Sequence, residues 1–114
     1  MTMEMTTEEL DKGVTKITLN GRLDVAAAGQ IELRFNTIAG ARRAVIVDLS
    51  KVTFLASMGM RMLLIGAKTM ASKGGKMALL APAAEVAAVL KTARIDSLIP
   101  IYDQPEAALA GVAA

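Results

Sequence analysis

The first twenty residues carry the spacing of two β-strands. Side chains between residues 14 and 20 alternate with a period of two, and residues 3–10 form a weaker strand pattern. Asp11-Lys12-Gly13 between these segments is typical of a turn. A period of two on both sides of a short turn predicts an antiparallel hairpin, which Asn20-Gly21 is expected to end.

A helical pattern follows, at residues 25–38. Asp24 precedes it at a good N-cap position, and Gly40 is expected to stop the helix. The apolar face of this helix is expected to hold Ala27, Ala28, Ile31, Phe35 and Ile38.

The rest of the chain alternates between short apolar runs and helical segments. The runs at residues 44–47 and 77–80 are typical of strands buried on both faces of a parallel sheet. Shorter extended pieces are expected at residues 52–55 and 98–102. The predicted helices are at residues 57–72, ended by Gly74-Gly75, at residues 83–93, with Pro82 in the first turn, and from Pro105 onward.

These elements give the order β-β-α-β-α-β-α-β-α. Strands joined by helices pair in parallel through right-handed crossovers. We therefore expect a single α/β domain over residues 1–114, in which an N-terminal hairpin precedes parallel βα units. The length fits one compact domain, and 54% hydrophobic residues are enough for an ordinary core.

The composition excludes several classes of function. The chain contains no cysteine and no histidine, so it has no disulfide, thiolate metal site, histidine-ligated zinc or Ser-His-Asp triad. We assign no catalytic residue, no metal ligand and no cofactor, and we expect a binding protein and not an enzyme.

Charge and hydropathy indicate which partners and which cellular location to expect. The formal net charge is +2 and the charges are scattered, with Arg42-Arg43 the only adjacent basic pair. No basic stripe indicates a nucleic-acid partner. No apolar run reaches the roughly 18–20 residues of a membrane span. The first ten residues lack the features of a signal peptide, so a cytoplasmic location is expected.

The junction around Ser57, where a strand leads into a helix, is the strongest candidate for a binding surface. In open α/β sheets, binding sites gather at the carboxyl ends of strands. Capping of the helix is the simpler role for Ser57, as it is for Asp24 at the preceding junction. A phosphate on Ser57 would face the positive end of the helix dipole, so the helix would tolerate it.

The helix after Ser57 has two distinct groups of side chains. One stripe at helical spacing is expected to pack in the core: Gly59, Met62, Leu63, Gly66, Ala67 and Met70. Met58, Met60, Arg61 and Leu64 lie elsewhere around the first turns. Methionine is adaptable and suits protein contact where it is exposed. Met58 and Met60 either contact a partner or pack in the core or a loop in the ordinary way, and both interpretations stay open.

Three segments resemble the STAS domain family, and specifically the bacterial anti-sigma factor antagonists. Residues 20–24 are similar to the family's G-x-L-D sequence, and residues 45–59 to its strand-D-L-S-x-V-x-F signature before the phosphorylated serine. Residues 74–80 match its glycine-rich return to the next strand. The resemblance covers nearly the whole chain. It implies a four- to five-stranded mixed sheet with about four helices, mainly on one face.

The resemblance also implies a mechanism. Ser57 would be phosphorylated by a partner that is both an anti-sigma factor and a serine kinase. The unphosphorylated form would bind this partner and release a sigma factor, and the phosphorylated form would not bind. We expect a monomer or weak dimer. The implied partner surface comprises Asp24, Ala56, Ser57, Met58, Gly59, Met60 and Arg61.

Two further interpretations stay open. The family usually has an acid at the position of Ala56 and Ser or Thr at that of Met58, and here Met60-Arg61 replaces a common Leu-Gly. These differences favour an unphosphorylated STAS subunit of a larger assembly, such as a lipid-transport ABC complex or a stressosome-type scaffold. A small enzyme or ligand-binding domain is the third interpretation, and the absence of histidine and cysteine argues against it.

Overall fold

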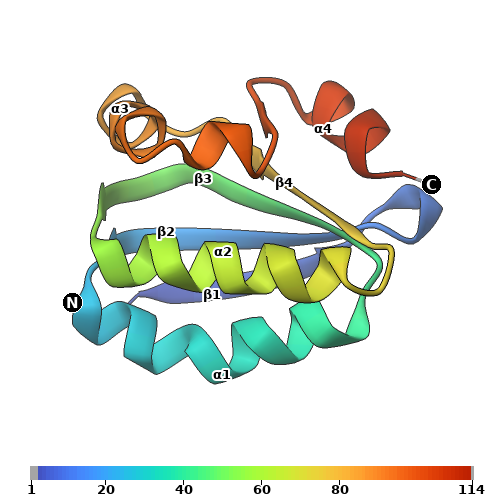
Figure 1. Ribbon diagram of the computed structural model, residues 1–114, viewed down its shortest axis with the longest axis horizontal. Coiled ribbons are helices and arrows are strands. Elements are labelled where there is room, and N and C mark those ends of the chain that lie inside the picture. Colours follow the sequence, from blue (N-terminus) through green and yellow to red (C-terminus); the bar gives the residue numbers. More distant parts are fainter. Residues whose placement is uncertain (1–2, 114) are drawn as a thin grey trace.

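The computed structural model describes residues 3–113, in which a five-stranded mixed sheet packs with four helices (Figure 1). The strands are β1 (Glu4–Glu9), β2 (Thr15–Leu23), β3 (Ala44–Leu55), β4 (Lys76–Leu80) and β5 (Ile101–Tyr102). The helices are α1 (Val25–Ala41), α2 (Ser57–Ala71), α3 (Ala84–Thr92) and α4 (Pro105–Val112), with short 3-10 turns at Asp11–Gly13 and Ile95–Ser97.

The strands lie in the sheet in their order along the chain. β1 pairs antiparallel with β2, and every later pair, from β2–β3 to β4–β5, is parallel. This confirms the predicted hairpin followed by parallel βα units. Because parallel strands point the same way, the carboxyl ends of β2, β3 and β4 meet at one edge of the sheet. The helices α1, α2 and α3 begin beyond that edge.

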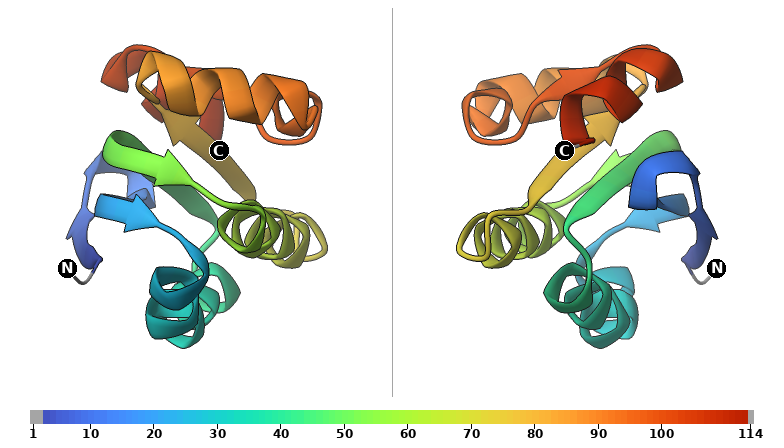
Figure 2. Two further views of the ribbon diagram at one scale, coloured as in Figure 1. Left: turned by 90° about the vertical axis from the view of Figure 1, so that its left-hand side faces the viewer. Right: turned by 90° about the vertical axis from the view of Figure 1, so that its right-hand side faces the viewer.

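The two faces of the sheet are covered unequally. Val45, Val47 and Leu49 of β3 belong to the larger core cluster, to which α1, α2 and α3 all contribute buried side chains. Ala44 and Ile46 alternate with them and belong to a smaller cluster with α4. Figure 2 shows α2 and α4 on opposite sides of the sheet. α1, α2 and α3 therefore contribute to the larger core cluster and α4 to the smaller one, while α3 and α4 both lie above the strands in the view of Figure 1.

β3 is one strand of twelve residues, and the prediction of two separate extended pieces at residues 44–47 and 52–55 is wrong. Two register shifts against β2 place extra residues in β3, and beyond Leu49 the buried positions recur every third residue, at Val52 and Leu55. Bulges of this kind bend a strand and interrupt its alternation.

β2 also continues past the expected stop at Asn20-Gly21, as far as Leu23. Gly21 has φ 126°, a backbone conformation that favours glycine, and it lies beside one of the register shifts. The glycine therefore bends the strand instead of ending it. The bend and the bulges together carry β2 and β3 side by side to their common end, Leu23 beside Leu55.

Three other predicted boundaries move by a few residues. Gly40 lies inside α1, which ends one residue later, where the Arg42 N–H donates to the Ile38 carbonyl. Pro82 precedes α3 instead of lying in its first turn, because Ala83 is the N-cap. The last strand is reduced to Ile101–Tyr102 by the turn that precedes it.

Both edges of the sheet are protected. β1 exposes Glu4, Glu8 and Glu9, and charged side chains on an edge strand discourage pairing with another chain. β5 at the other edge has only two residues.

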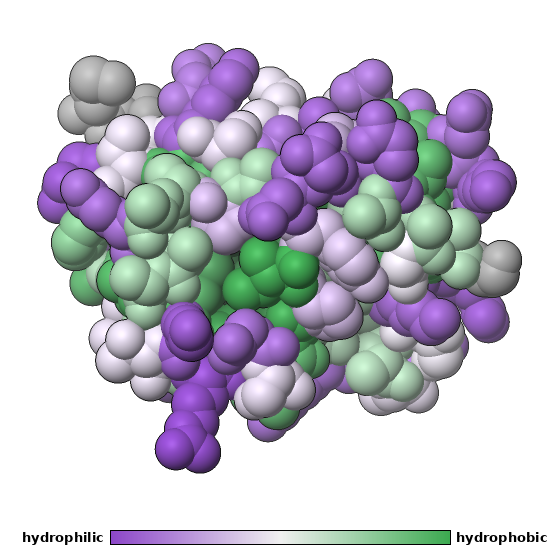
Figure 3. Space-filling model, turned by 90° about the horizontal axis from the view of Figure 1, so that it is seen from above, coloured by the Kyte–Doolittle hydropathy of each residue, from purple (hydrophilic) through white to green (hydrophobic). Residues whose placement is uncertain are grey.

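On the face that carries α3 and α4, apolar side chains gather in the centre and hydrophilic ones surround them (Figure 3). Within residues 3–113, no helix is long and apolar enough to cross a membrane.

Asp48 is a buried carboxylate on the face of the sheet that α4 partly covers. Its Oδ1 accepts a hydrogen bond from the Ser50 N–H at 2.9 Å, and its Oδ2 lies 3.4 Å from the Lys16 ammonium. Burial raises the pKa of Asp48, but the Ser50 hydrogen bonds and the Lys16 charge lower it by more, so the pKa lies below the usual 3.8.

This lowered pKa predicts an acid-sensitive contribution to stability. The contribution is complete above the pKa of Asp48 in the unfolded chain and is lost as the pH falls through its lower pKa in the folded protein. We expect Asp48→Asn to flatten the decline in the free energy of unfolding below about pH 5, measured by urea denaturation across a pH series. Asp96 is exposed, so Asp96→Asn is the control for removal of one carboxylate. An unchanged decline in Asp48→Asn would contradict the assignment.

Candidate binding surface at the strand-to-helix junctions

Two strand-to-helix junctions lie side by side at the carboxyl edge of the sheet. Leu23 at the end of β2 pairs with Leu55 at the end of β3, and the Ala56 N–H donates to the Leu23 carbonyl at 2.9 Å. Asp24 and Ala56 each follow directly, so α1 and α2 begin from adjacent positions. The parallel pairing of β2 and β3 thus brings the two sequence candidates, residues 24 and 56–61, to one edge.

Asp24 caps α1, as its position in the sequence predicts. Its side chain accepts from the Ala27 N–H at 2.9 Å, while its backbone carbonyl accepts from the Ala28 N–H at the same distance. The carboxylate therefore satisfies one of the free N–H groups at the start of the helix. Asp24 is half-buried, which leaves part of it at the surface.

Ser57 is not the N-cap of α2, so that prediction is wrong. Ala56 holds this position, with extended backbone angles, and its carbonyl accepts the first helical hydrogen bond from the Met60 N–H at 3.1 Å. Ala56 has no polar side chain, so no cap hydrogen bond forms. Because β3 ends one residue earlier than a serine cap requires, Ser57 becomes the first helical residue and its side chain is exposed.

The missing cap predicts that α2 can be stabilised at Ala56. Ala56→Asp is expected to raise the free energy of unfolding by about 1 kcal/mol, because the carboxylate would accept from free N–H groups and face the helix dipole. Asp24→Ala at the neighbouring helix is the reciprocal variant, with an expected loss of about 1 kcal/mol. Urea denaturation measures both. A destabilising Ala56→Asp would show that the first turn of α2 cannot accept a cap.

Gly59 lets α2 pass close to the strand ends. A Cβ at this position would lie 2.7 Å from Leu23 Cγ and 3.0 Å from Leu55 Cδ1. Gly59 is buried, so it seats the first turn of α2 against β2 and β3. The predicted core stripe of α2 is otherwise confirmed, with Ala67 half-buried and the remaining members buried.

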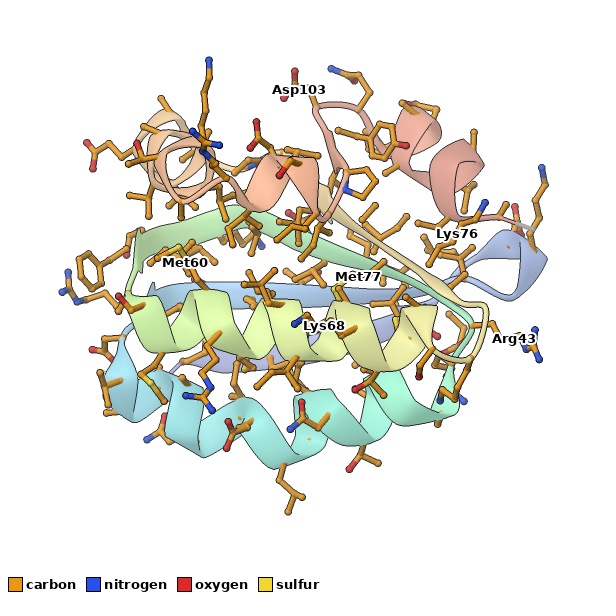
Figure 4. All side chains as sticks on the ribbon, viewed as in Figure 1. Arg43, Met60, Lys68, Lys76, Met77 and Asp103 are labelled. Atoms are coloured by element: carbon orange, nitrogen blue, oxygen red, sulfur yellow. The ribbon has the colours of Figure 1, made fainter. Side chains whose placement is uncertain are left out.

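The exposed part of the predicted surface is smaller than the full set. Ser57 and Arg61 are exposed, and Met58 is 41% exposed. Met60 is half-buried and packs against the core on the side of α2 that faces β3 (Figure 4). Ser57 and Arg61 stand four residues apart on one helix, which places them on the same face.

Three exposed residues at this edge escaped the sequence prediction. Phe54 is 40% exposed and stacks under the guanidinium of Arg22, whose Cζ lies 4.3 Å from the ring centroid. Val25 at the start of α1 is 64% exposed. The β2–β3 register pairs Arg22 with Phe54, which a sequence pattern interrupted by bulges conceals. Exposed apolar side chains in a group are typical of an interaction surface.

A pocket of about 360 Å³ adjoins this edge, between β3 and the start of α3. It is lined by Ser50, Val52, Thr53, Ala83, Ala84, Glu85 and Val86. This lining offers small and apolar side chains with one carboxylate. Among residues 3–113, no group of three or more acidic side chains is placed to hold a metal ion.

Comparison with known proteins agrees with this geometry. BtrV of Bordetella bronchiseptica, which carries the name of anti-sigma factor antagonist, is 28% identical over 109 residues, covering 95% of this chain and 93% of BtrV. An anti-sigma factor antagonist structure from Thermotoga maritima has a TM-score of 0.86 at 24% identity, with 95% and 93% of the two chains covered. The Bacillus cell fate determinant SpoIIAA in its phosphorylated form has a TM-score of 0.73 at 22% identity, with 95% and 98% covered.

The family assignment rests on a match along most of the chain. The STAS domain family matches residues 6–108, a range that runs from β1 into α4 and includes both junctions. The fold is that of the anti-sigma factor antagonist structures. This protein is therefore a member of the STAS domain family.

Proposed function

We propose that this protein is an anti-sigma factor antagonist that binds an anti-sigma factor with serine kinase activity through the edge around Ser57. The observation that carries the proposal is the exposed Ser57 at the start of α2, at a junction that also exposes Met58 and Phe54. BtrV, which is 28% identical over 109 residues, bears the name of such an antagonist. Phosphorylation of Ser57 ends the binding.

The physical basis of the switch is a change of charge within an apolar contact. A phosphate on Ser57 adds about −1.5 to −2 charges at neutral pH. Within the protein, the dianion faces the uncapped start of α2 and stands one turn from the exposed Arg61, so the fold accepts it. A partner packed on Met58 and Phe54 would have to desolvate that charge, which strongly disfavours the complex.

The structure of SpoIIAA in its phosphorylated form supports this mechanism by analogy of fold. The phosphorylated protein and this chain share the same architecture at a TM-score of 0.73. A STAS fold therefore accommodates a phosphate.

The test is incubation with the cognate kinase and ATP, followed by mapping of the phosphate and a binding assay. Ser57→Ala is expected to bind the anti-sigma factor and to resist release by ATP, and Ser57→Asp is expected to lose binding. Ser72→Asp, at the far end of α2, is the matched control for added charge. Phosphate on another residue, or equal binding by Ser57→Asp, would refute the switch.

The apolar neighbours of Ser57 favour one alternative function. Ala56 and Met58 make the junction apolar, which suits a permanent contact in a larger assembly such as a lipid-transport ABC complex or a stressosome-type scaffold. In that case Ser57 stays unmodified, and the protein co-purifies with an ATPase subunit or other scaffold chains. Isolation of the native complex, with identification of its components, separates the two functions.

A further inference from the structure

A basic pocket lies at the amino ends of the parallel strands β3 and β4, which is the end of the sheet opposite the Ser57 junction. Its volume is about 340 Å³, within the range of small-molecule sites. The residues that line it are Lys12, Gly13, Arg43, Ala44, Gly74, Lys76 and Val112. Three of these carry a positive charge and none carries a negative charge. We call this cavity the basic pocket.

The fold assembles the basic pocket from segments far apart in the sequence. Lys12 lies in the hairpin turn, Arg43 directly precedes β3, and Lys76 begins β4. Ala44 pairs with Lys76 in the β3–β4 register, and the Lys76 N–H donates to the Arg43 carbonyl at 2.8 Å. Figure 4 shows Arg43 and Lys76 at the same end of the molecule, with Arg43 extending outward from it. Basic residues that are scattered along the chain thus come to one end of the molecule.

The remaining cations of this edge are already engaged. Arg42 pairs with Glu9 at 3.7 Å and donates to Thr15, and the Lys73 ammonium donates to the Gly40 carbonyl. No ion pair joins Lys12, Arg43 or Lys76 to a carboxylate among the described residues. Like charges around one cavity repel each other, and a bound anion removes that repulsion.

We propose that the basic pocket binds a small molecule carrying at least two phosphate groups. Three cations at the rim match two or more separated anionic groups, and Lys and Arg are the usual donors to phosphate. Ala44 and Val112 supply an apolar floor for the rest of the ligand. The lining has no aromatic side chain for a base to stack on, which disfavours a nucleic acid as the ligand.

The backbone at Lys12 gives independent support. Lys12 adopts φ 63° and ψ 26°, a left-handed conformation that is unfavourable for lysine and ordinary for glycine or asparagine. The turn therefore holds a lysine at a position where glycine or asparagine would adopt the backbone conformation with less strain. Residues held in such conformations are often functional. This site is separate from the Ser57 edge, so the proposal does not depend on the proposed function.

The test is a titration of the protein with pyrophosphate at constant ionic strength, followed by NMR of the backbone amides. Saturable shifts are expected at Gly13, Ala44, Gly74 and Val112. The double variant Arg43→Gln/Lys76→Gln is expected to weaken binding about tenfold or more. Lys91→Gln, an exposed cation at the end of α3, is the charge control and should leave the affinity unchanged.

Three results would overturn the proposal. The first is the absence of saturable shifts in the unmodified protein. The second is an equal loss of affinity in Lys91→Gln, which would show a response to net charge alone. The third is binding to vesicles that contain phosphoinositides without binding to pyrophosphate, which would assign the pocket to a membrane surface. Thermal unfolding of each variant without ligand verifies that the variants are folded.

Discussion

Leu23→Ala is expected to lower the free energy of unfolding by about 2–5 kcal/mol. Leu23 is fully buried at the end of β2, where its side chain lies under the first turn of α2. Its backbone carbonyl also accepts the Ala56 N–H, which ties the two junctions together. Truncation leaves a cavity beneath the candidate binding surface, so urea denaturation should show a large loss.

A double-mutant cycle with Gly59 tests this packing directly. Gly59→Ala alone places a methyl group 2.7 Å from Leu23 Cγ and is expected to cost about 1–3 kcal/mol, partly offset by the better helix propensity of alanine. In the Leu23→Ala background, the new methyl group enters the vacated space. The double variant should therefore lose less stability than the two single variants combined, by about 1 kcal/mol or more.

Gly29→Ala is the matched control for the cycle. Gly29 lies inside α1 with nothing within 4 Å of the added Cβ, so the substitution should stabilise by about 0.5–1 kcal/mol. Additive effects of Leu23→Ala and Gly59→Ala would show that the two side chains do not compete for the same space. The packing described for the junction would then be incorrect.

Phe54→Ala is expected to weaken binding of the anti-sigma factor about tenfold to a hundredfold, with little change in stability. A large aromatic side chain at the centre of an interface often carries much of the binding energy. Phe54 is 40% exposed at the proposed edge and is oriented by Arg22 above its ring. Titration calorimetry with the purified anti-sigma factor measures the affinity, and urea denaturation measures the stability.

Leu33→Ala separates a local effect from a general loss of apolar surface. Leu33 is 81% exposed, halfway along α1 and away from the strand-to-helix junctions. The Leu33→Ala variant should bind the anti-sigma factor with the same affinity as the unmodified protein. If Phe54→Ala and Leu33→Ala both bind as tightly as the unmodified protein, the contact lies elsewhere. If both bind more weakly by the same factor, the interface extends along α1.

The order of elements can be read from the sequence, whereas the full length of β3 cannot. The run at residues 44–47 is apolar throughout, as a doubly covered strand requires. Beyond Leu49, each bulge adds a residue, so buried positions recur at a spacing of three, which is foreign to a strand. The same register shifts hide the pairing of Arg22 with Phe54.

The candidate site shows the same division between local and long-range information. The cap at Asp24 depends on residues three and four positions away, and its prediction is confirmed. The start of α2 depends on where β3 leaves β2, which is a tertiary property, so the predicted serine cap is wrong by one residue. The basic pocket joins Lys12, Arg43 and Lys76 across three loops and has no signature in the sequence.

The charged edge strand has a consequence for stoichiometry. A regulator that acts by occupying its partner must be present in amounts comparable to that partner. At such concentrations, a sheet with an open apolar edge would recruit further copies of itself and remove them from the free pool. Glu4, Glu8 and Glu9 on β1, and the brevity of β5, disfavour that extension. For the antagonist that we propose, we therefore expect little loss of free protein to pairing through the sheet edges.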